Sequence, residues 1–146
     1  MSFLYTYAKS QIIADTPGID LDNDDIEVML VMSNTTADTE EDKEHVADFT
    51  TLDEMDGVNY ARQNLANPAI SVDTANDRAL FDADDQLWNA LGNGARQVQA
   101  ALIYKNTGAA ATDIPIAYID VGGFPFDPGG DDVAITWHAT GIIQGT

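Results

Sequence analysis

The sequence contains no cysteine, so neither a disulfide framework nor a thiolate metal site can be part of the fold. Basic residues are scarce: six Lys and Arg stand against 25 Asp and Glu, and the formal net charge at pH 7 is −19. A surface of this charge repels nucleic acid and anionic membranes, because phosphate binding requires clustered bases. No apolar run is long enough to span a bilayer. We therefore expect partners that are neither nucleic acid nor membrane.

Two further absences concern targeting and habitat. The start, MSFLYTYAKSQII, has no basic region and no uninterrupted apolar core before a small-residue cleavage site, so we expect no export signal. Lysine is rare while aspartate is abundant, a composition that resembles proteins of halophiles, in which surrounding salt screens self-repulsion. Simple solubility is the alternative explanation of the charge.

What the chain does contain predicts a folded domain. A hydrophobic fraction of 45% argues against disorder, and 146 residues suffice for one core, so we expect a single domain over residues 1–146. Residues 3–14 have apolar positions near helical spacing and predict a short N-terminal helix. Residues 26–32, IEVMLVM, are apolar on both phases except at Glu27 and predict a central strand covered on both faces.

The C-terminal third carries the strongest pattern. Its segments QVQAALIYKNTG, IPIAYIDVGG and DDVAITWHATGIIQ alternate with period two and are bounded by Gly, Pro, Asn or Asp. Weaker strand candidates lie at residues 59–62, 69–73, 78–81 and 86–91, with a turn at Asn76-Asp77. This succession predicts a mainly β protein, an antiparallel β-sandwich or barrel.

Residues 33–56 interrupt the strand pattern with an acidic stretch. Nine acids lie between residues 38 and 56 and are opposed only by Lys43. We expect a long exposed loop here, with one or two helical turns within residues 40–49. Loops of this length in compact domains are usually functional or become ordered against a partner.

The spacing Asp20-x-Asp22-x-Asp24 is a weak candidate for a metal site, because carboxylates at alternate positions can converge on calcium. An EF-hand loop needs Gly at its sixth position and Glu at its twelfth, where this chain has Asp25 and Val31. The alternative is an acidic turn leading into a strand. Another cation site within the acidic stretch is an equally weak candidate.

No catalytic constellation is recognisable. His45 and His138 lie in dissimilar contexts far apart in the sequence, no serine sits in a Gly-x-Ser-x-Gly elbow, and a pair of carboxylates means little among 25 acids. The glycine pairs at residues 122–123 and 129–130 lack the following Lys of a phosphate-binding loop. We expect no enzyme and no cofactor.

The aromatic residues are candidates for packing. Phe124 and Phe126 lie in a Pro- and Gly-rich loop, where an apolar side chain suggests contact with a neighbouring subunit. Four others lie on or beside alternating strands, a position that favours core or subunit-interface packing over a sugar-binding platform. These are Trp88, Tyr104, Tyr118 and Trp137.

The order of these segments resembles small structural proteins of tailed-virus virions, from bacteriophages or archaeal viruses, particularly head decoration or cement proteins. The resemblance is carried by ALIYKNTG, IPIAYIDVGG and DDVAITWHATGII, preceded by YAKSQII, IEVMLV and DADDQLWNALGNGARQVQ. It covers most of the chain except residues 33–56. It implies a β-sandwich or β-tulip-like barrel, a homotrimer, and binding to the major capsid protein on the outer capsid surface, where the chain would stabilise the head.

Two segments are the expected contacts with capsid or neighbouring subunits. One is the N-terminal segment 1–14, and the other is the loop around Phe124. The side chains concerned are Phe3, Leu4, Tyr5, Tyr7, Phe124 and Phe126. Two alternatives remain open: a tail, neck or fibre-base subunit of a virion, and a carbohydrate- or cation-binding β-sandwich module.

Overall fold

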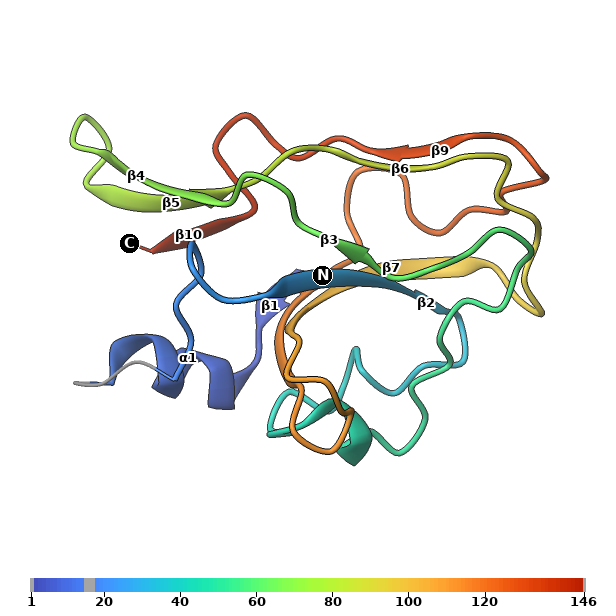
Figure 1. Cartoon of the computed structure of the whole chain (residues 1–146), viewed down its shortest axis with the longest axis horizontal. Coiled ribbons are helices and arrows are strands. Elements are labelled where there is room, and N and C mark those ends of the chain that lie inside the picture. Colours follow the sequence, from blue (N-terminus) through green and yellow to red (C-terminus); the bar gives the residue numbers. More distant parts are fainter. Residues whose placement is uncertain (1, 15–17, 146) are drawn as a thin grey trace.

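The computed structural model describes residues 2–14 and 18–145 of the chain. Within them the protein is mainly β, with one α-helix, and every strand pair is antiparallel (Figure 1). The predicted fold class, antiparallel sheets with a short N-terminal helix, is confirmed. The same residues contain no helix whose length and apolar character would allow it to cross a bilayer.

A five-stranded sheet forms the centre of the molecule. Its strand order is β1-β8-β7-β2-β3. Strand β2 pairs with β7 over its whole length and is buried at every position except Glu27, as its apolar sequence predicts. The strands of this sheet are β1 (Phe3–Leu4), β2 (Ile26–Met32), β3 (Gln63–Asn64), β7 (Val98–Lys105) and β8 (Ile114–Ile119).

Two smaller sheets complete the β structure. In Figure 1 they lie above the five-stranded sheet, while the helix and residues 33–56 lie below it. A three-stranded sheet has the order β10-β5-β4, and a separate pair joins β6 to β9. The strands are β4 (Ala69–Asp73), β5 (Arg78–Asp82), β6 (Gln86–Trp88), β9 (Val133–Ile135) and β10 (Ile143–Gly145).

The local predictions for these strands have mixed outcomes. Strand β4 coincides with the predicted residues 69–73, and Asn76 and Asp77 form part of the turn into β5, as expected. The strand predicted at residues 59–62 is wrong, because Asn59 has a φ of 66° and turns the chain, so that pairing starts only at β3. The strand predicted from the alternation at residues 133–138 is too long, because β9 ends at Ile135.

The predicted N-terminal helix is present as α1 (Thr6–Ile13). Its first turn closes with a hydrogen bond from Lys9 N to Tyr5 O at 3.0 Å, and Thr6 N donates to Glu41 O at 2.9 Å, so the acidic stretch satisfies one of the free amides at the start of the helix. Ala8 is the one residue of α1 that is fully buried. The helix therefore joins the layer below the sheet.

Residues 33–56 form the predicted long acidic loop, but the expectation that it is exposed throughout is wrong. This segment, called the acidic segment below, folds back onto the central sheet through Met32 N to Asp53 O at 2.7 Å and Met55 N to Leu30 O at 2.9 Å. Its predicted helical turns reduce to a single 3₁₀ turn, η1 (Val46–Asp48). The segment buries its apolar side chains while most of its carboxylates remain at the surface. The buried residues are Ala37, Val46, Phe49 and Met55.

Candidate functional site

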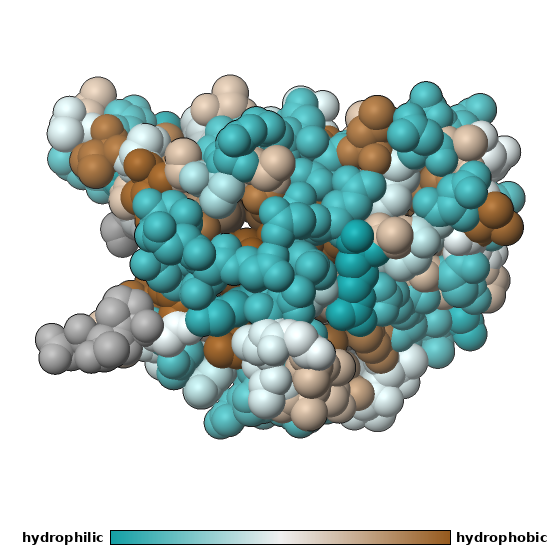
Figure 2. Space-filling model, in the orientation of Figure 1, coloured by the Kyte–Doolittle hydropathy of each residue, from teal (hydrophilic) through white to brown (hydrophobic). Residues whose placement is uncertain are grey.

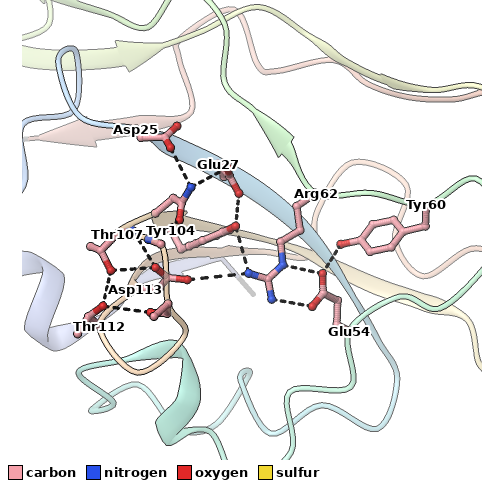
Figure 3. A network of polar contacts seen from close by, with 12 residues as sticks. Asp25, Glu27, Glu54, Tyr60, Arg62, Tyr104, Thr107, Thr112 and Asp113 are labelled. Atoms are coloured by element: carbon pink, nitrogen blue, oxygen red, sulfur yellow. Dashed lines mark hydrogen bonds and ion pairs between the residues drawn. The ribbon is translucent and has the colours of Figure 1, made fainter.

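A cluster of polar side chains surrounds Arg62, which lies just before β3 (Figure 3). Four other segments contribute to it. Glu27 comes from β2, Tyr104 from β7, Glu54 from the end of the acidic segment, and Asp113 from the residue before β8. These residues are far apart in the sequence, and the sheet brings them together.

The guanidinium of Arg62 holds Glu54 with two parallel hydrogen bonds. Its Nε and Nη2 donate to the two carboxylate oxygens at 2.8 and 2.7 Å. Its Nη1 donates to the Tyr104 hydroxyl at 3.2 Å, and the guanidinium carbon lies 5.2 Å from the centre of the Tyr104 ring. The hydrogen bonds to Glu54 raise the pKa of Arg62 above its usual range, so the cation is permanent.

The two phenols of the cluster remain protonated. Tyr60 donates to Glu54 Oε1 at 3.0 Å and accepts the backbone amide of Leu30, also at 3.0 Å. Burial, reinforced by the charge of Glu54, raises the pKa of Tyr60 above its usual range. Tyr104 donates to Glu27, and burial raises its pKa likewise. Neither phenol is poised to act as a base near neutral pH.

Asp113 is the most buried carboxylate of the cluster, with 2% of its surface exposed. Its Oδ1 accepts the amide and the hydroxyl of Thr107 at 2.7 and 3.0 Å, and its Oδ2 lies 4.0 Å from Arg62 Nη1. The hydroxyls of Thr107 and Thr112 meet at 2.5 Å. Asp113 thereby fastens the connection between β7 and β8.

Asn106 completes the cluster at the edge nearest Asp25. Its amide donates to Asp25 at 2.8 Å and to Glu27 at 3.0 Å. The carboxylates drawn in Figure 3 are thus each held by donors of the chain itself. A general base needs a lone pair that can reach a substrate. The geometry suits a structural clamp that ties the acidic segment to β2, β7 and β8.

The weak cation candidate at Asp20, Asp22 and Asp24 is an acidic turn closed by internal bonds. Asp24 Oδ2 accepts the amide of Asp20 at 2.7 Å and lies 2.8 Å from the ammonium of Lys105. The side chains of Asp20 and Asp22 share a hydrogen bond, which lowers the pKa of Asp20 and raises the pKa of Asp22. Across residues 2–14 and 18–145, no three His, Asp or Glu side chains are grouped to hold a metal ion.

Most of the expected N-terminal contact residues pack within the chain. Tyr5 is fully buried and donates to Ala37 O at 2.7 Å, so its side chain is not available to another protein. Phe3 stacks on Tyr118 with ring centres 5.4 Å apart. Leu4 is half-buried beside the core. These residues lie here because β1 pairs with β8.

Tyr7 and the two histidines lie nearer the surface. The half-buried Tyr7 ring lies 6.1 Å from that of His45, and His45 Nδ1 lies 3.4 Å from Asp48. His138 is exposed, and its Nδ1 lies 2.7 Å from the Thr140 hydroxyl. Each histidine is thus engaged by near neighbours in its own segment.

Phe124 and Phe126 line a groove of about 680 Å³ beside β9. Their rings lie 5.5 Å apart, and both are half-buried. Phe126 is fixed to β7 by reciprocal backbone bonds with Val98 at 2.9 and 3.0 Å. The groove also includes Val121, which is 59% exposed, and the buried Trp137. The groove beside the Phe124 loop is therefore accessible to a partner, and the expected subunit contact there stays a prediction.

Both tryptophans pack in the core, one of the two kinds of packing expected for them, although Trp137 lies just beyond the end of β9 and not on a strand. Trp88 donates its indole N–H to Ala61 O at 2.8 Å, and Trp137 donates to Asp84 O at 3.0 Å. Both are buried. Their ring faces are therefore largely covered by the chain itself, which leaves little of either ring for a sugar to stack on.

The hairpin of β4 and β5 carries a surface that the sequence did not reveal. Ile70 and Val72 are 51% and 74% exposed. Ile70 borders a cleft of about 270 Å³ that separates this sheet from Ile12 and Ile13 of α1. The hairpin extends beyond the central sheet in Figure 1, and hydrophobic atoms lie over it in Figure 2. The period-two pattern predicted the strand β4, but it did not predict that the side chains of Ile70 and Val72 are exposed to solvent.

Comparisons of the chain with protein-family models, with curated proteins and with solved structures give no match.

Proposed function

We propose that this chain is a structural subunit of a tailed-virus particle, a decoration protein that binds the major capsid protein from outside and stabilises the head. The observation that carries the proposal is the grouping of open apolar side chains in two places, the Phe124 groove and the β4–β5 hairpin. Apolar residues scattered singly need no explanation, whereas grouped ones mark interaction surfaces.

The charge distribution around the groove also supports contact with another protein. Although the chain has a net charge of −19, Asp132 alone is acidic among the described residues that line the groove. A partner surface can cover Phe124 and Val121 without removing many carboxylates from water, a step that costs several kcal/mol for each unpaired ion (order of magnitude). We assign the capsid contact to this groove.

The stabilising mechanism follows from repetition. A capsid presents the same site many times in a symmetric lattice, so a contact of modest affinity is repeated over the whole shell. A chain that touches two neighbouring capsid subunits holds both, and the second contact forms at high effective concentration. The shell then resists the outward pressure of packaged DNA better than it does without the chain.

The first experiment compares capsids with and without this protein. Capsids that lack it are expected to assemble but to rupture at lower temperature, and purified wild-type chain should restore their resistance. The variant Val121→Lys places a charge in the groove and should restore it poorly. Val58→Lys is the matched control, because Val58 is 73% exposed but lies outside the groove. Equal rupture temperatures with and without the chain would refute the stabilising role.

Copy number separates a head protein from a tail, neck or fibre-base subunit. A decoration protein should approach the abundance of the major capsid protein in purified particles, as measured by quantitative mass spectrometry. A few copies per particle would instead assign the chain to one of the other positions.

A carbohydrate-binding module is the second candidate, because the groove combines an aromatic ring, Phe124, with the polar side chains of His138 and Asp132. Titration of the isolated chain with glycans tests it. Phe124→Ala is the informative variant, whereas Trp137→Ala would also disturb folding, because Trp137 is buried and bonded to Asp84. Glycan binding that Phe124→Ala abolishes without unfolding would favour this candidate.

A further inference from the structure

We propose that the free edge of β4 pairs with β4 of a second copy of this chain. The two strands would run antiparallel about a two-fold axis at Ser71, and the two three-stranded sheets would become one continuous sheet. This inference does not depend on capsid binding, because it concerns the purified chain alone.

The backbone of the hairpin shows which groups lie at the free edge. Strand β4 has β5 on one side and no described strand on the other. The carbonyl of Phe81 in β5 accepts Ile142 N at 2.7 Å, so the backbone groups of Phe81 point toward β10. Backbone groups alternate in direction along an antiparallel strand, so those of Leu80 point toward β4 and meet Ser71, which lies opposite.

The same alternation turns the backbone groups of Ile70 and Val72 away from β5. Both residues therefore present an N–H and a C=O at the edge, together with side chains that are 51% and 74% exposed. Natural proteins usually protect such an edge with a lysine, an internal proline or a bulge. The sequence of β4 is AISVD, and its pairing with β5 runs in regular register from Ala69 to Asp73. The edge thus lacks these protections.

The strand is complementary to itself in the proposed register. With the two-fold axis at Ser71, Ile70 lies opposite Val72 of the second copy, and the two residues exchange both backbone hydrogen bonds as a hydrogen-bonded pair. Their apolar side chains then pack across the junction on one face of the joined sheet. Ala69 lies opposite Asp73 of the second copy, so no carboxylate faces another.

Charge explains why two such acidic chains would meet at this strand. With a net charge of −19 on each copy, contact is least costly where carboxylates are few; β4 itself has only Asp73, and the acid nearest to it across the hairpin is Asp82, opposite Ala69. Asp73, the one acid of β4, is held by Asn76 at 2.7 Å and Arg78 at 2.9 Å, and these bonds lower its pKa below the usual range. Its charge is therefore compensated within its own hairpin.

The first test measures the mass of the chain by light scattering over a range of concentrations. The expected species has twice the 15.7 kDa mass of the chain. Dimerisation should strengthen in salt, because the Debye length falls from about 10 Å at 0.1 M to about 3 Å at 1 M and the repulsion between copies is screened.

A pair of matched variants tests the location of the contact. Val72→Lys should weaken dimerisation at least tenfold, whereas Val58→Lys should leave it unchanged. The two valines are 74% and 73% exposed, and both variants make the chain less negative by the same amount. A loss confined to Val72→Lys cannot then come from overall charge. Circular dichroism checks that both variants fold.

A cysteine crosslink tests the register. The chain has no cysteine of its own, so Ser71→Cys introduces a single thiol. Facing Ser71 residues form a non-hydrogen-bonded pair with Cα atoms about 4.5 Å apart, within the range that a disulfide spans. Mild oxidation should crosslink Ser71→Cys into a covalent dimer, whereas the exposed Ser33→Cys control should not form one at the same rate.

Several results would overturn the inference. They are a monomer at every concentration and salt, a trimer such as the virion resemblance implies, a dimer that Val72→Lys leaves intact, or a Ser71→Cys variant that crosslinks no faster than Ser33→Cys. None of these outcomes bears on capsid rupture, so the two proposals fail separately.

Discussion

The acidic segment and the β4–β5 hairpin contrast in charge and in burial. The acidic segment has nine acids between residues 38 and 56, yet its side chains Val46 and Phe49 are buried in the hydrophobic core. The hairpin has an ordinary strand pattern, yet Ile70 and Val72 remain open. Charge density is therefore a poor guide to exposure in this protein. Burial depends on whether a segment's apolar side chains reach the central sheet.

The carboxylates of the two regions also differ in what they bind. In the acidic segment, Glu40 accepts a bond from the Thr36 hydroxyl at 2.7 Å, four residues away, and bonds from the Thr50 amide and hydroxyl at 2.8 and 2.6 Å, ten residues away. In the hairpin, Asp73 accepts bonds from Asn76 in the turn and from Arg78 at the start of β5. Glu40 thus holds together distant parts of the acidic segment, whereas Asp73 stabilises only the hairpin in which it lies.

The largest effect is expected from Phe49→Ala. Phe49 is buried with its ring 5.5 Å from that of Tyr5, so the substitution leaves a cavity between the acidic segment and the core. We expect the free energy of unfolding to fall by about 3–5 kcal/mol, measured by urea denaturation. A loss below about 1 kcal/mol would mean that the acidic segment is not anchored as described.

The next effect concerns two arginines. Arg62→Leu leaves Glu54 and Asp113 without their cation, and we expect a loss of about 2–3 kcal/mol, because the site is only partly screened by water. Arg78→Leu, which breaks the pair with Asp73 in the hairpin, should cost less than about 1 kcal/mol. Equal losses in denaturation experiments would remove the distinction between tertiary and local ion pairs.

The third effect depends on pH. Hydrogen bonds from Thr50 and Thr36 lower the pKa of Glu40 from 4.5 to about 2. Because the folded state favours the ionised form, this stabilisation is complete above pH 4.5 and is lost as pH falls toward 2. Glu40→Gln should lower the melting temperature by a few degrees near neutral pH, with the difference shrinking below pH 4.5.

The control for this effect is Glu44→Gln, which removes the same charge at an exposed position. It should leave the melting temperature nearly unchanged at every pH. A Glu40→Gln difference that stays constant down to pH 2 would show that the hydrogen bonds do not favour the carboxylate.

The smallest effect is expected from Val72→Ala. Val72 is 74% exposed, so the loss of two methyl groups should change the unfolding free energy of the monomer by no more than about 0.5 kcal/mol. The measurement requires dilute protein, below the concentration at which copies associate. A loss as large as that of Phe49→Ala would mean that the hairpin face is covered within the monomer.

Sequence patterns predicted the local elements well and the clustered residues poorly. The apolar run of β2 and the alternation of β4 are properties of neighbouring residues, so their strands could be recognised directly. The failure at residues 59–62 follows from the turn at Asn59, which no alternation signals. The Arg62 cluster could not be predicted, because strand register brings Glu27 and Asp113 to it from distant positions.

The amino-acid sequence by itself determined the class of the protein: no disulfides, a net charge of −19, and period-two strands that could pair only as a mainly β fold. The tertiary structure alone decided which apolar residues are buried, covering Phe49 and leaving Val72 open. The physical reason is that the hydrophobic effect has no direction and no sequence range. An apolar side chain is buried wherever the assembled sheets provide a surface, and the pattern of its neighbours does not say where that surface lies.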